Sequence, residues 1–411
     1  MDIKIEPSVL SGSVKIPSSK SYAHRLLICA GLSRGKSVIK GISHSKDIDA
    51  TIASMTALGA EFIVRDDEIE VQGIENPSKS AVLDCCESGS TLRFLIPVAA
   101  ALGVEAEFHG QGRLPQRPID IFTRELSTNG IKFDYNNTMP FTISGQLHGG
   151  VYKLEGNVSS QFVTGLLFAL PLLKEDSQII MTSKLESKPY VDMTIESLKM
   201  FGIEIDECEN GYKICGGQVY RPCDCTVEGD FSQAAFFYVA NAIGNDIKIE
   251  NLNPLSVQGD KKILEIIREM CYNKNTGHLN YFNADCSDIP DLVPILAVLG
   301  CIGDNPSEIH NAERLRIKES DRLAAVSDML NRLGGKVTVL DDGLRIEPAK
   351  LHGGIVESFG DHRIVMSAAI AALKADGEVI IKGAEAVEKS YPNFFEDYIN
   401  LGGKANVITL D

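Results

Sequence analysis

Residues 51–64 read Thr-Ile-Ala-Ser-Met-Thr-Ala-Leu-Gly-Ala-Glu-Phe-Ile-Val, and the fold can be argued outward from this stretch. Apolar residues recur at i, i+3 and i+7, which predicts a helix with one apolar face. Gly59 then suits the left-handed residue that closes a helix, and an alternating strand follows. The pattern recurs at residues 121–135 around Gly130, 194–205 around Gly202, 325–339 around Gly334 and 394–408 around Gly402, with a weaker copy from Ile263 to Asn275 in which Asn replaces Gly.

A second kind of helix alternates with the first and is apolar on nearly all sides. Such helices are buried. Each copy starts with small polar residues, and the copies begin near residues 18, 87, 158, 229, 287 and 360. The chain therefore divides into six α/β units of about 70 residues, each with one buried and one surface helix. Six units in 411 residues are expected to form two domains of three.

The starts of the buried helices are candidate anion sites. Free backbone N–H groups and the positive end of the helix dipole meet there. Any single Ser in these positions is explained by helix capping alone, so the inference depends on the set. Cations lie at or near these starts, namely Lys20, Arg25, Arg93 and Arg363. The sequence therefore predicts a site for small molecules with several negative charges.

Composition limits the partners and the compartment. The net charge of −16 argues against nucleic acid and anionic membranes. Apolar stretches such as residues 162–173 are too short to cross a membrane, and no signal segment is recognisable at the start. Ten cysteines are scattered without a C-x-x-C pair, which favours reduced thiols over disulfides or zinc. We expect a cytoplasmic protein.

Residues 19–25, Ser-Lys-Ser-Tyr-Ala-His-Arg, resemble a motif of the EPSP synthase family, the 3-phosphoshikimate 1-carboxyvinyltransferases. The resemblance runs from about Val14 to the end of the chain. Each block is weak alone, but ten in order at the family spacing are specific. The other nine blocks lie at residues 88–93, 114–118, 159–162, 187–190, 227–230, 288–291, 318–322, 361–363 and 389–392.

The resemblance implies an α/β fold of the enolpyruvyl transferase type, an inside-out α/β barrel with six β-α-β-α-β-β repeats, three per domain. It places residues 17–227 in an N-terminal domain on the shikimate 3-phosphate side. Residues 1–16 and 228–411 would form a C-terminal domain on the phosphoenolpyruvate side. The active site would lie in the cleft between the domains.

By resemblance, the enzyme transfers the carboxyvinyl group of phosphoenolpyruvate to the 5-hydroxyl of shikimate 3-phosphate by addition and elimination. Both substrates carry a phosphate and a carboxylate, so several cationic donors are needed. The residues implied for shikimate 3-phosphate are Lys20, Ser21, Arg25, Ser159, Ser160, Gln161, Ser187, Asp291 and Lys318. Those implied for phosphoenolpyruvate are Lys20, Gly89, Arg117, Gln161, Arg322, Arg363 and Lys389.

The chemistry needs a base for a hydroxyl and an acid for a carbon atom. By resemblance, Asp291 is the base and Glu319 the acid, with Lys20 sharing proton transfer. No metal or cofactor is called for, the partners are small-molecule substrates, and the family is monomeric. Glyphosate occupies the phosphoenolpyruvate site in the family. Glu87 departs from the family pattern: it either weakens phosphoenolpyruvate binding or points outward.

Two alternatives remain at this stage. The first is the homologous transferase that acts on UDP-N-acetylglucosamine, whose signature loop carries a reactive Cys where residues 110–118 have none. Its Lys-Asn opening is replaced here by Lys20 and Ser21. The second is a non-catalytic phosphate-binding relative, against which the presence of Asp291 and Glu319 argues.

Overall fold

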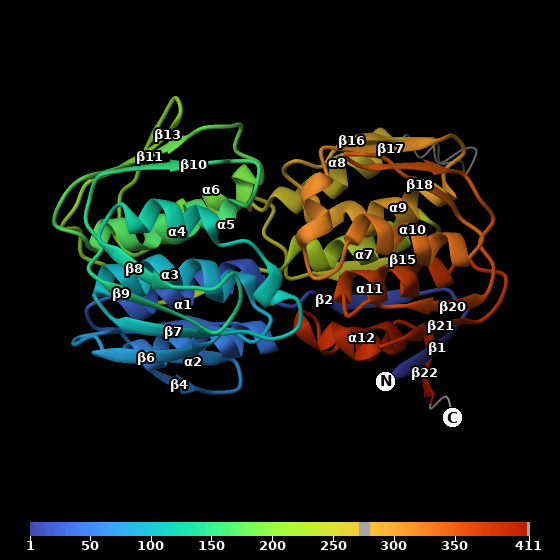
Figure 1. Cartoon of the computed structure of the whole chain (residues 1–411). Coiled ribbons are helices and arrows are strands. Elements are labelled where there is room, and N and C mark those ends of the chain that lie inside the picture. The colour runs from blue at the N-terminus through green and yellow to red at the C-terminus, as the bar shows by residue number, and fades with distance from the viewer. Residues whose placement is uncertain (271–279, 409–411) are drawn as a thin grey trace. The chain divides into compact units, whose positions relative to one another are not determined.

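The computed structural model describes residues 1–270 and 280–408, which form two compact units (Figure 1). The N-terminal unit is Ser18–Glu228, and the C-terminal unit combines Met1–Pro17 with the chain from Gly229 onward. The sequence places these divisions after residues 16 and 227, whereas the contacts divide the chain after residues 17 and 228. Each unit is described below by itself.

The N-terminal unit contains the following described elements. Its helices are α1 (Lys20–Leu32), α2 (Lys46–Leu58), α3 (Gly89–Leu102), α4 (Asp120–Ser127), α5 (Ser160–Ala169) and α6 (Lys188–Met200), with the short 3-10 helices η1 (Leu114–Gln116) and η2 (Leu170–Leu172). Its strands are β3 (Lys36–Lys40), β4 (Glu61–Val64), β5 (Glu68–Gln72), β6 (Ser80–Asp84), β7 (Glu105–His109), β8 (Ile131–Asp134), β9 (Phe141–Gly145), β10 (Val151–Leu154), β11 (Ser177–Met181), β12 (Asp206–Cys208), β13 (Gly211–Ile214) and β14 (Cys225–Thr226).

The C-terminal unit repeats the same kinds of element. Its described helices are α7 (Phe231–Ala242), α8 (Ile263–Glu269), α9 (Val293–Ile302), α10 (Arg322–Arg332), α11 (His362–Ala372) and α12 (Phe394–Asn400), with the 3-10 helices η3 (Gly259–Lys262), η4 (Pro290–Leu292), η5 (Glu313–Ile317) and η6 (Ala384–Lys389). Its described strands are β1 (Asp2–Glu6), β2 (Ser11–Lys15), β15 (Asp246–Glu250), β16 (Asn283–Asp285), β17 (Ser307–His310), β18 (Lys336–Val339), β19 (Leu344–Glu347), β20 (Gly354–Glu357), β21 (Val379–Lys382) and β22 (Lys404–Ile408).

The strands form one small sheet per repeat. Within the described residues, five sheets have four strands, and in each the first pair is parallel and the other two pairs are antiparallel. Their orders are β14-β3-β5-β4, β6-β7-β9-β8, β10-β11-β13-β12, β16-β17-β19-β18 and β20-β21-β1-β22. The sixth sheet is the parallel pair β15-β2. The predicted six-fold repetition is confirmed.

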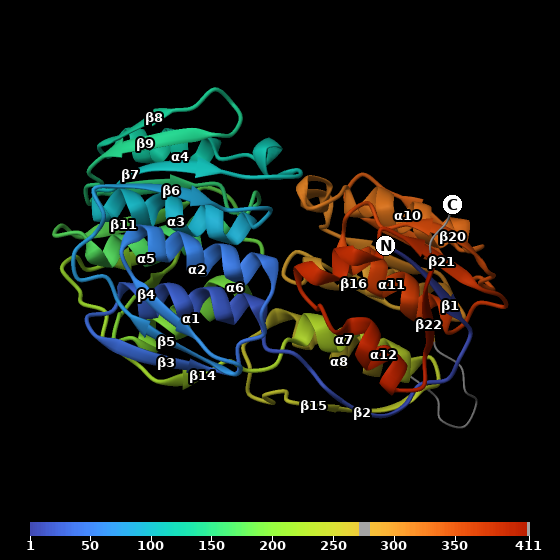
Figure 2. The ribbon, with the colours of Figure 1, turned by 90° about the horizontal axis from the view of Figure 1, so that it is seen from below.

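The buried helices lie inside each unit, and the sheets lie outside them (Figures 1 and 2). In α1 every residue from Tyr22 to Leu32 is buried, and in α9 the same holds from Val293 to Cys301. Full burial of a Val, Leu, Ile or Phe side chain contributes about 1.5–3 kcal/mol relative to leaving it exposed. The interior of each unit is therefore helical, as the two predicted kinds of helix require.

Left-handed glycines follow the surface helices, as predicted. Gly59, Gly130, Gly202, Gly334 and Gly402 have φ of 116°, 102°, 78°, 84° and 94°. A residue with a Cβ would be strained in this conformation. The Asn expected to close the fourth surface helix falls in residues 271–279, outside the described residues.

The first strands of the chain complete sheets whose other strands come much later. β1 lies between β21 and β22 and is antiparallel to both, while β2 pairs in parallel with β15. Residues 1–17 therefore pack with the C-terminal unit. None of the described helices combines the length and the apolar character that crossing a membrane requires.

Candidate functional site

The start of α1 holds Lys20 against a buried carboxylate. Ser19 caps the helix, and its Oγ accepts a hydrogen bond from the backbone N–H of Tyr22. Lys20 is the first helical residue, and its Nζ donates to Asp47 Oδ2 at 2.8 Å. Asp47 lies in the first turn of α2 and is 5% exposed. Because a buried carboxylate fixes the ammonium group, Asp47 orients Lys20, a role that its position in the sequence did not reveal.

Arg25, one turn further along α1, is buried and joins this helix to α6. Its Nε donates to Thr194 Oγ1 at 2.8 Å, and its two Nη atoms donate at 2.7 Å to the carbonyl oxygens of Ser21 and Tyr190. Burial lowers the pKa of Arg25 to about 10, so the group stays cationic at neutral pH. A guanidinium has five N–H groups, so within the described residues two remain to meet an anion.

Ser187, at the start of α6, is a buried residue with φ of 56°. A non-glycine residue adopts this left-handed conformation at a cost, which marks the position as specially shaped. The other serines predicted to bind shikimate 3-phosphate lie at the start of α5. Ser159 caps that helix, its Oγ accepting the N–H of Gln161, and Ser160 is the first helical residue.

Gly89, Arg117 and Gln161, all predicted to hold phosphoenolpyruvate, meet at the start of α3. An added Cβ at Gly89 would lie 2.7 Å from Arg117 Nη1 and 3.5 Å from Gln161 Oε1. Gln161 Nε2 donates to Ser90 Oγ at 3.1 Å, which joins the starts of α3 and α5. The missing side chain of Gly89 is therefore what lets the Arg117 guanidinium approach the end of the helix.

Arg93 belongs to the same group, although sequence reasoning noted it only as a cation near a helix start. Its Nη1 donates to Gln161 Oε1 at 2.8 Å, and its Nη2 donates to the carbonyl oxygen of Pro118 at 3.0 Å. Its guanidinium carbon lies 5.2 Å from the ring centroid of Phe162. Arg93 thus fixes both Gln161 and the segment that carries Arg117. Its place in the motif at residues 88–93 was the available signal.

Glu87, the departure from the family pattern, is exposed. An added Cβ at Gly112 would lie 2.5 Å from its Oε1, so the carboxylate lies beside the loop that precedes Arg117.

A chain of hydrogen-bonded side chains runs from α1 through α2 to the start of α3. Distances of 2.7 Å separate His24 Nδ1 from Thr51 Oγ1 and Thr51 Oγ1 from Thr91 Oγ1. Thr91 in turn donates to the capping Ser88 Oγ at 2.8 Å. Burial lowers the pKa of His24 to about 3, so its imidazole is neutral. His24 is thus a structural part of the helix packing that positions Gly89.

The C-terminal unit gathers its charged residues around Arg322, the first residue of α10. Arg322 is 2% exposed, and each of its three nitrogens donates to a different carboxylate at 2.8 Å. Nε donates to Asp361, Nη1 to Asp291 and Nη2 to Glu319. Although burial opposes the charge, the three carboxylates raise the pKa of Arg322 above its ordinary value. The predicted base and the predicted acid thus share one guanidinium.

Arg363, on α11, binds the second oxygen of Asp291. Its Nη2 donates to Asp291 Oδ2 at 2.8 Å. Burial favours the neutral form of Asp291, but the charges of Arg363 and Arg322 outweigh it and hold the pKa of this carboxyl well below its usual range. Asp291 is therefore ionised in this structure, and both of its oxygens are engaged.

Asp361 is the most buried of the three carboxylates that bind Arg322. It is fully buried and caps α11, its Oδ1 accepting the N–H of Arg363 at 3.0 Å. Its Oδ2 accepts Ser320 Oγ at 3.0 Å as well as Arg322 Nε. Sequence reasoning quoted Asp361 within a motif but assigned it no role. The structure shows that it orients the guanidinium of Arg322 and caps the helix that carries Arg363.

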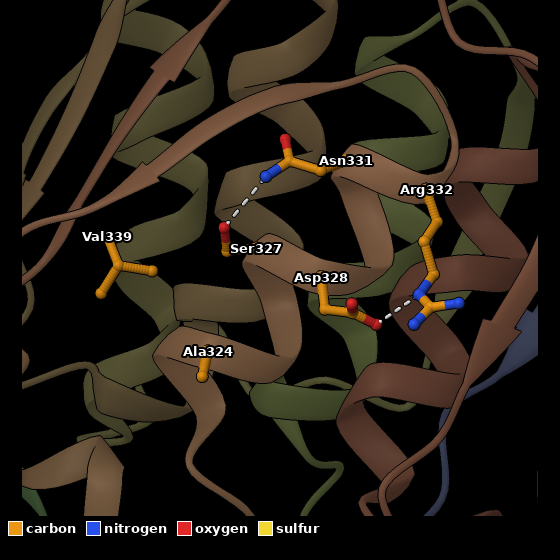
Figure 3. Close-up of a pocket in the computed structure, with 6 residues that line it drawn as sticks. All are labelled: Ala324, Ser327, Asp328, Asn331, Arg332 and Val339. Atoms are coloured by element: carbon orange, nitrogen blue, oxygen red, sulfur yellow. Dashed lines mark hydrogen bonds and ion pairs between the residues drawn. The ribbon is translucent and has the colours of Figure 1, made fainter.

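Two lysines complete the predicted set. Lys318 precedes Glu319, and burial lowers its pKa to about 8 although Asp291 and Glu319 oppose the shift. Lys389 is 7% exposed and ends η6, which packs against α11. A separate surface groove along α10 is lined by Ala324, Ser327, Asp328, Asn331, Arg332 and Val339 and contains none of the predicted residues (Figure 3).

Comparison with solved structures identifies the fold. EPSP synthase from Acinetobacter baumannii superimposes with a TM-score of 0.82 at 24% identity, over 99% of this chain and all of that one. The enolpyruvyl transferase NikO from Streptomyces tendae gives 0.77 at 17% identity, over 100% and 99%. The fold is that of the enolpyruvyl transferases.

Comparison of sequences narrows the class to a family. The profile of EPSP synthase (3-phosphoshikimate 1-carboxyvinyltransferase) matches residues 5–398. The enzymes of that name from Clostridium novyi and Clostridium perfringens are each 46% identical, over 98% of both chains in the first case and over 97% of this chain and 98% of the relative in the second. The chain belongs to the EPSP synthase family. The predictions of family and fold are confirmed, and the alternative acting on UDP-N-acetylglucosamine is not favoured.

Proposed function

We propose that this chain transfers the carboxyvinyl group of phosphoenolpyruvate to the 5-hydroxyl of shikimate 3-phosphate and releases phosphate. Family membership supplies the reaction. The observation that best supports the assignment of residues is the sharing of Arg322 by Asp291 and Glu319, because it brings an acid, a base and an anion-binding group together.

Phosphoenolpyruvate finds cationic donors in both units. In the N-terminal unit the Gly89, Arg117 and Gln161 group offers a helix start and a guanidinium. In the C-terminal unit Arg322 and Arg363 offer two more. Lys20 and Lys389 add one charge in each unit. We therefore propose that residues of both sets bind phosphoenolpyruvate.

Substrate binding changes the state of Asp291 in this proposal. An anion that binds Arg322 or Arg363 replaces Asp291 as their partner. Once the guanidinium groups are shared with the substrate, the pKa of Asp291 rises toward its ordinary value. The carboxylate then becomes a stronger base at the moment when the substrate is in place.

The reaction then follows in two stages. Asp291 takes the proton of the 5-hydroxyl while the hydroxyl oxygen bonds to C2 of phosphoenolpyruvate. Glu319 gives a proton to C3. In the second stage the C2–O bond to phosphate breaks and C3 returns a proton to the Glu319 carboxylate, which restores the double bond. Lys20, oriented by Asp47, shares in proton transfer. General acid and base help of this kind contributes about 10²–10⁴-fold each.

Shikimate 3-phosphate is assigned to the remaining residues. Arg25 supplies the two N–H groups that its internal hydrogen bonds leave over. The hydroxyl groups of Ser21, Ser159, Ser160 and Ser187 come from the starts of α1, α5 and α6. Lys318 contributes a cation from the C-terminal unit.

The test is a phosphate-release assay with both substrates, in which the vinyl protons of the product are followed by proton NMR. Phosphate release that needs both substrates supports the proposal. Release with UDP-N-acetylglucosamine in place of shikimate 3-phosphate supports the related transferase instead. Binding of both substrates without release, measured by calorimetry, supports a non-catalytic relative.

We also propose that the enzyme works as a monomer in the cytoplasm. The scattered cysteines without C-x-x-C pairs suit a reducing compartment. Light scattering coupled to size-exclusion chromatography tests the monomer, since a dimer would have twice the mass of 44.7 kDa.

A further inference from the structure

The C-terminal unit contains a buried carboxyl group, that of Asp260, to which the reaction assigns no role. It belongs to the Gln258-Gly259-Asp260 segment at the start of η3. Gln258 is itself buried and fixes this segment to the first turn of α7: its Oε1 accepts the N–H of Phe231 at 3.0 Å, and its Nε2 donates to the carbonyl oxygen of Gly229 at 2.8 Å. Asp260 therefore has little freedom to move.

Asp260 has few partners for a buried acid. It is 2% exposed, and its Oδ2 accepts a hydrogen bond from Ser232 Oγ. Its Oδ1 has no hydrogen-bond partner among the described residues. Asp361, which is fully buried, and Asp291, which is partly buried, are in contrast bound to guanidinium groups. An ionised oxygen buried without a donor costs more than the protonated carboxyl, so geometry alone favours a proton on Asp260.

The electrostatic surroundings act in the same direction. Burial makes the largest contribution and the charge of Asp291 on η4 the next largest. Together they raise the pKa of Asp260 to about 7. Arg363 on α11 and the hydrogen bond from Ser232 oppose them, while Asp230 at the cap of α7 adds to them. Burial is the main cause that raises the pKa of the Cys286 thiol, and the charges of Asp285 and Asp260 add to it. Asp260 thus interacts with the base and with an arginine assigned to phosphoenolpyruvate.

We infer that Asp260 is a positioning residue that acts through Arg363 and Asp291, and that its proton keeps the charge of Arg363 available to phosphoenolpyruvate. This inference rests on the proposed function. With the proton in place, Asp260 adds no negative charge near Arg363, and the substrate can replace Asp291 as the partner of this guanidinium. When Asp260 ionises, a second buried anion competes with the substrate for the same guanidinium.

The experiment measures the KM for phosphoenolpyruvate in the phosphate-release assay, at saturating shikimate 3-phosphate, from pH 5.5 to 9. Three proteins are compared: the native chain, Asp260→Asn, and Asp328→Asn as a matched control. Asp328 lies in the groove of Figure 3, is paired with Arg332, and contacts none of the groups named above. The substrate phosphate titrates identically in all three, so the difference between proteins isolates Asp260.

We expect the KM of the native chain for phosphoenolpyruvate to rise about 3- to 10-fold more across pH 7 than that of Asp260→Asn, since a shift of one pKa unit corresponds to tenfold. The control should match the native chain. Equal pH profiles for the native chain and Asp260→Asn would overturn the inference. Failure of the native chain to bind phosphoenolpyruvate or release phosphate would overturn the proposed function instead.

A second variant tests the inference if Asp260→Asn does not fold. Ser232→Ala removes the one hydrogen bond that favours the ionised form of Asp260. The midpoint of the pH-dependent rise in KM should therefore move to higher pH, with the KM at pH 6 unchanged within twofold. In the native chain, carbon-13 labelling of aspartate carboxyls should also show one buried group titrating near pH 7. Absence of that signal, or an unmoved midpoint in Ser232→Ala, would contradict the inference.

Discussion

The Arg322 guanidinium donates to Asp291 at 2.8 Å while Arg363 holds the other oxygen of the same carboxylate. The proposed base is thus bound to the two cations that its substrate is proposed to use. Substrate binding and activation of the base become one event, because an anion must displace Asp291 from the two arginines in order to bind. The following predictions test this relationship and the neighbouring contacts.

Asp291→Asn should separate catalysis from binding. The amide cannot accept the 5-hydroxyl proton, so kcat should fall by about 10²–10⁴-fold. It also attracts the two arginines less strongly, so the dissociation constant of phosphoenolpyruvate should stay equal or fall. Phosphate release and calorimetry measure the two quantities, with Asp328→Asn as the control. A variant that loses phosphoenolpyruvate affinity and kcat in proportion would contradict the proposed competition between Asp291 and the substrate for the two arginines.

Gly89→Ala should impair phosphoenolpyruvate selectively. The new Cβ would lie 2.7 Å from Arg117 Nη1, so the guanidinium must retreat from the start of α3. We expect the KM for phosphoenolpyruvate to rise about tenfold, equivalent to about 1.4 kcal/mol. The KM for shikimate 3-phosphate should change by less than twofold, and inhibition by glyphosate should weaken. Equal effects on both substrates would sink the assignment of Gly89.

The lowered pKa of Lys318 predicts that shikimate 3-phosphate binds more weakly at alkaline pH. Its pKa is lowered to about 8, so its positive charge is present below pH 8 and lost above it. The KM for shikimate 3-phosphate should therefore rise as pH increases from 7 to 9. In Lys318→Arg the guanidinium stays charged, and the rise should disappear. Lys350→Arg, at a highly exposed lysine, should keep the native profile.

Asp361→Ala should destabilise the C-terminal unit. It leaves Arg322 Nε and Ser320 Oγ without their shared acceptor and removes the cap of α11. Breaking a buried ion pair on one side costs about 3–5 kcal/mol. Chemical denaturation followed by circular dichroism measures the loss. Asp361→Asn keeps a capping oxygen and should recover part of it, while a loss below 1 kcal/mol for Asp361→Ala would contradict the role given to Asp361.

The repeats, the two kinds of helix and the closing glycines could be predicted from sequence because they are local patterns. The pairing of β2 with β15 could not, since those strands lie more than 200 residues apart and no local pattern joins them. The fourth repeat was the weakest in sequence, and the described part of its sheet has two strands rather than four.

For the site, sequence identified residues but not their partners. Lys20 and Arg322 could be named from motifs, whereas the carboxylates that orient them, Asp47 and Asp361, could not. Asp47 and Asp361 both lie in first turns or caps of helices, where an acidic residue is expected for the helix alone. Their second role depends on helix packing that only the fold supplies. Asp260 escaped notice for the same reason.

The position of β1 between β21 and β22 has a consequence for synthesis on the ribosome. The N-terminal unit is one continuous segment and can fold as soon as residue 228 has emerged. The C-terminal unit must wait, with its first strand already made, until β21 and then β22 emerge from residue 379 onward and pair with β1. We expect β1 to spend most of translation as an unpaired edge, so that nascent chains stalled between the two points expose it to chaperones.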